Sequence, residues 1–119
     1  MDSILTSIKK LLGITEEYTH FDADITMHIN TVFGILTQLG VGPANGFSIM
    51  TEHEVWSDFL KEDPRLEMVK SFMHLKVKLL FDPPQSSALI QAMEKQASEL
   101  EWRISVTVDP GSESNNDSV

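Results

Sequence analysis

The sequence predicts a mainly helical protein: a small bundle of about four to five helices with a long Gly/Pro loop and an extended C-terminal tail. Apolar residues recur at steps of three and four along most of the chain, which is the spacing of one helix face. Glycines and prolines separate these stretches, where helices end. With 119 residues, of which 41% are apolar, the chain can bury one hydrophobic core.

The first predicted helix ends before Gly13, with Lys9 and Lys10 on its polar side. Its apolar face consists of Ile4, Leu5, Ile8, Leu11 and Leu12. A helix of about ten residues is marginally stable alone. We therefore expect this face to pack on the same domain or on a neighbouring subunit.

A second helix is expected to use Thr19 and Asp22 as capping residues and to end at Gly40. Its stripe is the most regular in the chain and consists of Ile25, Ile29, Val32, Phe33, Leu36 and Leu39. The stretch 40–48 contains three glycines and a proline, which predicts a structured loop. The loop lacks the lysine of a phosphate-binding loop, so we interpret it as a long turn between helices.

A short helix of about two turns is expected next, because Thr51 and Glu54 form a capping pattern ahead of an apolar side that includes Trp56 and Phe59. The following helix should start at Asp63-Pro64 and stop at Asp82-Pro83-Pro84. Its apolar residues cover more than one face, which is typical of a central helix.

The last helix should begin near Ser86 or Ser87, with its inward face made by Leu89, Ile90, Met93, Ala97, Leu100 and Ile104. After it, Ile104, Val106 and Val108 alternate with polar residues, a weak strand pattern. The residues beyond Pro110 are too polar to pack. We expect a helical domain over 1–104 and an extended, polar tail over 105–119, disordered or bound to a partner.

Composition excludes several classes of function. Nine basic and 18 acidic residues give a formal charge of −9, which repels nucleic-acid phosphates. Cysteine is absent, so disulfides and thiolate metal sites are excluded. No apolar run approaches the roughly 20 residues of a membrane span, and no signal-peptide pattern opens the chain. We expect a soluble protein that is made in the cytoplasm and has no membrane partner.

The sequence contains no pattern typical of a catalytic or metal site. The histidines, at positions 20, 28, 53 and 74, do not have the spacing of a zinc site. The serines lack a nucleophile elbow, and no inward-facing acidic pair is expected. We predict no enzymatic activity, no catalytic residues, no metal and no cofactor.

The densest basic group lies on the expected central helix and consists of Lys70, Lys76 and Lys78. It lacks the interleaved exposed aromatic residues of a nucleic-acid surface. The apolar residues of the short helices also exceed what one small bundle hides comfortably, which favours self-association. We interpret these lysines, together with Trp56, as candidate contacts between subunits.

Several short motifs follow one another in a distinctive order. They include Leu-Gly-Val-Gly-Pro at 39–43, Trp-x-x-Phe-Leu at 56–60, Leu-Leu-Phe-Asp-Pro-Pro at 79–84 and Glu-Leu-Glu-Trp-Arg at 99–103. In this order, from about Ile4 to Arg103, the chain resembles the head-to-tail connector proteins of long-tailed bacteriophages, which are also called adaptor or head completion proteins.

The resemblance implies a structural virion protein at the head-tail interface. It implies a ring, usually dodecameric, that lies beneath the portal and continues the DNA channel. The implied partners are further copies of the chain, the portal protein and the next connector or stopper protein, while double-stranded DNA passes without specific binding. In such families the C-terminal segment commonly binds the portal, which here assigns that contact to Trp102, Arg103, Ile104, Val106 and Val108.

A small helical DNA-binding regulator is the alternative reading. It would require a basic recognition helix and salt-dependent duplex binding, and the formal charge of −9 argues against both. A small helical enzyme or toxin would need an inward-facing polar cluster, which the pattern does not contain. Ring formation separates the connector from both.

Overall fold

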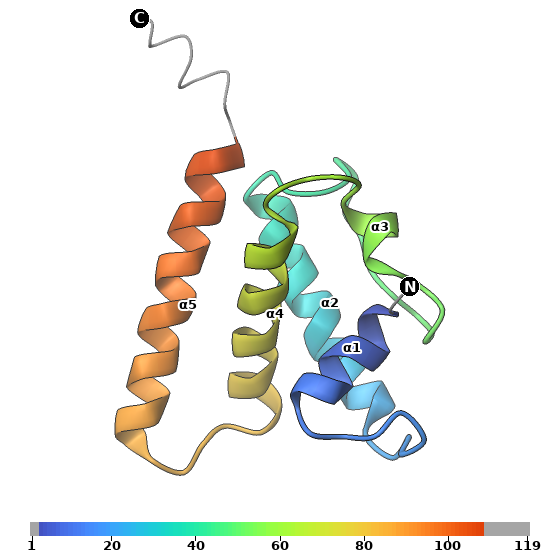
Figure 1. Ribbon diagram of the computed structural model, residues 1–119, viewed down its shortest axis with the longest axis vertical. Coiled ribbons are helices and arrows are strands. Elements are labelled where there is room, and N and C mark those ends of the chain that lie inside the picture. Colours follow the sequence, from blue (N-terminus) through green and yellow to red (C-terminus); the bar gives the residue numbers. More distant parts are fainter. Residues whose placement is uncertain (1–2, 109–119) are drawn as a thin grey trace, which may run out of the picture.

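The computed structural model describes residues 3–108, with side chains through Val106, as five α-helices joined by loops (Figure 1). The helices are α1 (Ile4–Leu11), α2 (Asp22–Gln38), α3 (Trp56–Phe59), α4 (Leu66–Phe81) and α5 (Ser87–Val108). Over this range the only β-type pairing is an isolated bridge between Ser3 and Val55. The prediction of a small, mainly helical bundle is confirmed.

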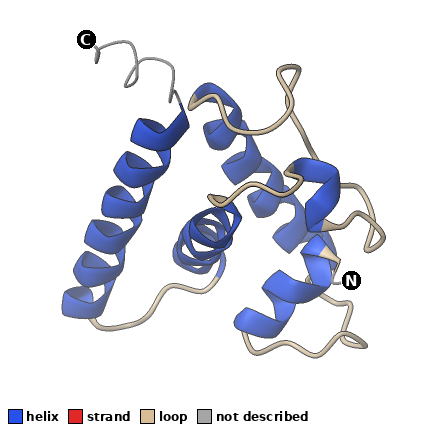
Figure 2. Ribbon diagram, turned by 45° about the horizontal axis from the view of Figure 1, so that its top comes forward, coloured by secondary structure: helices blue, strands red, loops and turns tan. Residues whose placement is uncertain are grey.

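Helix α4 occupies the centre of the bundle, with α1 and α2 packed on it from one side and α5 from the other (Figures 1 and 2). This position explains its wide apolar surface, because residues on several faces of α4 are needed to cover its neighbours. The buried side chains of α4 are Val69, Phe72, Met73, Leu75 and Val77. The helix ends at Asp82-Pro83-Pro84, as its prolines predict.

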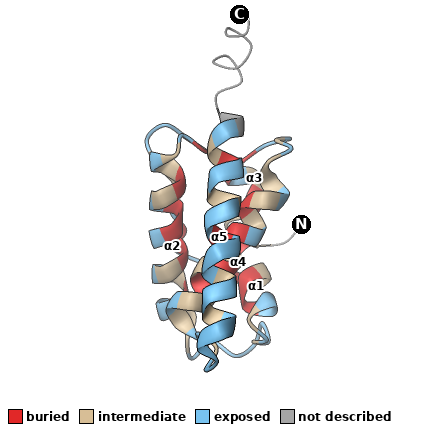
Figure 3. Cartoon of the chain, turned by 90° about the vertical axis from the view of Figure 1, so that its left-hand side faces the viewer, coloured by how far each residue is buried: buried red, intermediate tan, exposed pale blue. Residues whose placement is uncertain are grey.

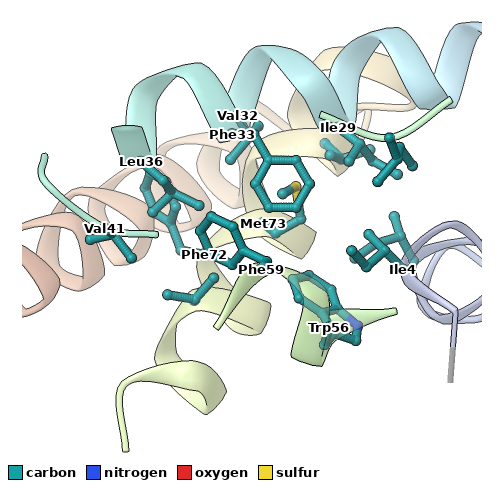
Figure 4. Packing of buried hydrophobic residues seen from close by; sticks show 14 of the residues in the cluster. Ile4, Ile29, Val32, Phe33, Leu36, Val41, Trp56, Phe59, Phe72 and Met73 are labelled. Atoms are coloured by element: carbon teal, nitrogen blue, oxygen red, sulfur yellow. The ribbon is translucent and has the colours of Figure 1, made fainter. Parts of the chain in front are cut away.

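The core lies where α2, α3 and α4 meet, and aromatic rings fill its centre (Figure 4). The Phe33 ring of α2 has its centroid 4.7 Å from that of Phe59 and 5.0 Å from that of Phe47. Tilted and edge-on ring pairs at these separations add to the burial of their apolar area. The short α3 is therefore held in place by the side chains it buries.

The loop between α2 and α3 is structured, as its composition predicts. Gly40, Gly42 and Gly46 have positive φ angles. The side chain of Asn30 binds both backbone polar groups of the buried Ile49: its Nδ2 donates to the carbonyl oxygen at 2.9 Å and its Oδ1 accepts from the amide at 2.8 Å. These two bonds fasten the loop to α2 and satisfy backbone groups that water cannot reach.

The N-terminal helix packs within its own chain, burying Ile4, Leu5 and Ile8 in the common core. The assignment of Lys9 to the polar side is wrong, since this lysine is 2% exposed. Its Nζ donates to the Glu16 carbonyl oxygen at 3.0 Å and lies 2.8 Å from Oδ1 of Asp22. A buried ammonium group needs such partners, and here they tie α1 to the start of α2.

Two helix starts differ from the prediction. Thr19 does not cap α2; its carbonyl oxygen accepts from the Asp22 amide in a turn, while the Asp22 carboxylate is engaged by Lys9. Helix α4 begins at Leu66 rather than at Pro64, although the Asp63 carboxylate accepts a hydrogen bond from the Arg65 amide at 2.8 Å, as expected of a capping residue.

Helix α3 has one turn rather than two. Leu60 leaves it in an extended conformation (φ −136°, ψ 125°), which allows this side chain to be buried. The Glu54 carboxylate does not cap the helix but accepts hydrogen bonds from the amides of Met50 and Thr51. Burial raises the pKa of Glu54, but the hydrogen bonds outweigh it and lower the pKa below its ordinary value.

The strand pattern predicted from Ile104 to Val108 is wrong, because α5 continues through Val108. Ile104 lies two turns after Ala97 on the same helix face, and both are buried in the common core. Burial of the Ile104 side chain outweighs the modest strand preference of the β-branched residues between positions 104 and 108. The extended tail thus does not begin at residue 105; its remainder, 109–119, lies outside the described residues.

Candidate interaction surfaces

The C-terminal half of α5 carries exposed apolar side chains. Trp102 is 64% exposed and Val106, one turn later, is 39% exposed. Residues four apart lie on one helix face, so these two side chains form a continuous apolar surface. Figure 3 shows that the outward surface of α5 is largely exposed along its length.

The other predicted portal-binding residues have different positions. Arg103 extends along the surface and binds the carboxylate of Glu99 at 2.8 Å. Ile104 is fully buried, so its side chain belongs to the core of the single chain. The side chain of Val108 lies outside the described residues. Trp102, Arg103 and Val106 are therefore the members of the predicted set that the fold leaves accessible.

The three lysines predicted to contact a neighbouring subunit do not form one patch. Lys70 lies 5.8 Å from the centroid of the Trp56 ring and borders α1, whereas Lys76 lines a hollow between α4 and α5. Lys78 forms an ion pair of 3.0 Å with Asp82 at the end of α4. A nucleic-acid surface needs basic residues clustered on one face, so these separate positions argue against such a surface on α4.

Trp56, predicted to lie between subunits, is buried within the chain. Its indole N–H donates to the Ser7 Oγ at 2.9 Å, which joins α3 to α1. Trp56 also lines the groove described next.

A groove of about 370 Å³ lies between α1 and α4. Its apolar lining includes Ile8, Leu11 and Trp56, and the exposed Lys10 and the partly exposed Lys70 also border it. This groove is not predictable from local sequence patterns, because its two walls come from segments about 60 residues apart.

His74 closes one part of this groove. Burial lowers the pKa of its imidazole, the nearby Lys78 lowers the pKa further, and a hydrogen bond to the Leu11 carbonyl oxygen partly opposes both effects. The hydrogen bond from His74 on α4 to Leu11 holds the end of α1 in place, which is a structural role. Across residues 3–108, moreover, no three His, Asp or Glu side chains gather as potential metal ligands.

The described part of the chain also contains no helix with the length and apolar character needed to span a bilayer. Its accessible features are surfaces suited to other proteins: an exposed tryptophan on α5 and an open groove between α1 and α4.

Comparison with known proteins agrees with this description. Residues 4–111 match a family model described as phage connector protein, which covers nearly the whole chain. No curated protein and no solved structure matches the chain. Proteins of this family are structural components of the phage virion, with a role at the head-tail junction and contacts to other head or tail proteins. The resemblance inferred from the motifs is thus confirmed, and the chain belongs to the phage connector protein family.

Proposed function

We propose that this connector forms a ring, dodecameric as in the proteins it resembles, which binds the portal, joins the head to the tail and continues the DNA channel. The family match over residues 4–111 is the observation that carries the proposal. The formal charge of −9 supports it, since an acidic channel wall lets DNA pass without binding its phosphates. The tail-side partner is then the next connector or stopper protein.

The portal contact is proposed to lie on the outward surface of α5 at Trp102, Arg103 and Val106. An exposed tryptophan is costly in water, and tryptophan and arginine are enriched among the residues that dominate binding energies. Beside Trp102 a shallow hollow of about 300 Å³ is lined by Leu39, Ser98 and Glu101, which offers space for a partner's side chain.

Replacing Trp102 with alanine tests this contact. Because the side chain is exposed, the variant should keep its helical content and its thermal stability. Its affinity for assembled portal rings, measured by co-sedimentation, should fall at least tenfold, the loss that about 1.4 kcal/mol corresponds to.

Leu89→Ala is the matched control, because it truncates an exposed apolar residue at the other end of the same helix. This variant should bind portal rings like the wild type. Equal binding by Trp102→Ala and the wild type would contradict the proposed portal surface while leaving the family assignment intact.

A further inference from the structure

Beyond its first turn, α2 and most of the loop that follows it carry no charged side chains. Residues 25–51 contain no Asp, Glu, Lys or Arg, whereas the longest such run elsewhere, 83–93, has eleven residues. In a protein with 23% charged residues this is a local departure in composition. Depletion of charge distinguishes the buried centre of a protein interface from the rest of a protein surface.

This uncharged stretch includes a single exposed helix face. The exposed positions of α2 beyond Asp24 are spaced four, three and four apart and consist of Met27, Thr31, Gly34 and Gln38. Met27 is 57% exposed, and no atom lies within 4 Å of a Cβ built on Gly34. The face is therefore low and open, with one long apolar side chain near its start.

A second exposed methionine lies in the loop that is bound to α2. Met50 is 85% exposed and directly follows Ile49, whose backbone is bound by the side chain of Asn30 on α2. Asn30 is one turn beyond Met27, so the loop is attached to α2 at this level. Methionine side chains adapt to irregular apolar hollows, which suits them to enter a groove.

The opposite side of the molecule provides such a groove. In Figure 3, α2 lies at one side, α1 and α3 lie at the other, and α4 and α5 stand between them. The α1–α4 groove thus lies away from the uncharged face, with apolar Leu11 exposed at its edge.

The charges around the two surfaces are complementary. Asp24 is exposed one turn before Met27, and the exposed Glu52 lies two residues after Met50. The groove has Lys10, Lys70 and Glu67 at its border, and Glu67 lies 3.7 Å from Lys70, so the border keeps an excess of one positive charge. Carboxylates beside the methionines and ammonium groups beside the groove would pair at the rim of a contact and fix its register.

We propose that the outer face of α2 binds the α1–α4 groove of a second copy of this chain, with Met27 and Met50 directed into it. A contact between two different surfaces on opposite sides of a subunit repeats around a ring, whereas a surface that binds itself stops at a dimer. The inference rests on the proposed ring, and it names the surfaces that build it.

Gly34→Arg tests the α2 face. A Cβ at this position has no neighbouring atom within 4 Å, and arginine is a better helix former than the glycine it replaces, so thermal stability should not decrease. In the contact it places a bulky charge at the centre of the uncharged face. The concentration needed for half-maximal assembly on portal rings, measured by native mass or sedimentation, should rise at least tenfold.

Two controls separate charge and size from position. Gln85→Arg adds the same charge at an exposed position between α4 and α5, and it should assemble like the wild type. For Gly34→Ala, the concentration needed for half-maximal assembly should rise no more than twofold, because a methyl group is small.

Cysteine pairs test which surfaces meet, since the wild type has no cysteine. Met27→Cys and Leu11→Cys chains, mixed, assembled on portal rings and oxidised, should form a disulfide-linked dimer. Neither variant should form one alone. The double variant should give a ladder of linked oligomers.

The outcomes are distinct. Normal assembly of Gly34→Arg, or cross-linking of Met27→Cys to itself, overturns the proposed contact while the ring stands. A wild-type chain that remains monomeric with portal rings overturns the ring and this contact together.

Discussion

Gly42 lies in the loop after α2 with a φ angle of +89°, a region that side-chain-bearing residues rarely adopt. A Cβ at this position would also collide with the ring of Phe59, which belongs to the aromatic centre of the core. Gly13 has a nearly identical φ angle of +83° but no neighbouring atom within 4 Å. The two positions therefore separate backbone strain from steric overlap.

Gly42→Ala should lower the free energy of unfolding by about 3 kcal/mol, as the sum of a left-handed backbone and overpacking. Gly13→Ala should lower it by about 1 kcal/mol, because only the backbone contribution remains. Urea denaturation followed by circular dichroism measures both. Equal losses for the two variants would show that Phe59 moves aside without cost.

His74 makes stability depend on pH. Burial and the nearby Lys78 lower the pKa of its imidazole in the folded chain, so the unfolded chain binds the proton more readily. The contribution of His74 to the free energy of unfolding therefore falls when the pH is lowered through the ordinary histidine range near pH 6.5, and it rises with pH.

The comparison of wild type with His74→Gln isolates this effect, because all other titrating groups are shared. The wild type should lose more stability than the variant when the pH is lowered from 7.5 to 5.5, as measured by urea denaturation at each pH. A larger loss in the variant would contradict the stated direction of the pKa shift.

At the scale of elements, local patterns predicted the existence and order of the helices but not all their ends. Gly40 and Pro83-Pro84 stop their helices through backbone constraints that are independent of tertiary context. The end of α5 depends on tertiary contact instead. Alternation of Ile104, Val106 and Val108 fits a short strand as well as a helix, and only burial of Ile104 decides between them.

This burial yields a matched pair of substitutions on α5. Ile104→Ala should lower the free energy of unfolding by about 3 kcal/mol, since it removes a fully buried side chain. Val106→Ala, two residues later and partly exposed, should change it by less than about 0.5 kcal/mol. If these residues formed a strand only on binding, both substitutions would change the free energy of unfolding of the isolated protein by small and equal amounts. Thermal denaturation of the two variants distinguishes the two cases.

The interaction surfaces were only partly predictable, because exposure is a property of the assembled fold. Trp56 and Trp102 are both flanked by apolar and acidic residues in the sequence, yet one is buried against α1 and the other is exposed on α5. The groove between α1 and α4 depends on their packing and has no sequence pattern. The charge-free run at 25–51 could have been recognised, although its exposed face becomes visible only with the helix placed.

For the molecule as a whole, the distribution of surfaces matters more than any single site. The described helices form one core, and the features they leave open face in different directions: α2 on one side, the α1–α4 groove on another and the outward surface of α5 between them. A subunit with several separate contact surfaces is suited to bind two neighbours in a ring and a further protein above or below it.

The native mass of the purified chain, measured alone and after mixing with assembled portal rings, tests the connector account most directly. We expect a portal complex that carries a fixed, ring-forming number of copies of the chain, whatever the mass of the free chain. The resemblance to connector proteins predicts twelve copies. A chain that stays monomeric in both conditions and leaves the mass of the portal ring unchanged would contradict the connector account.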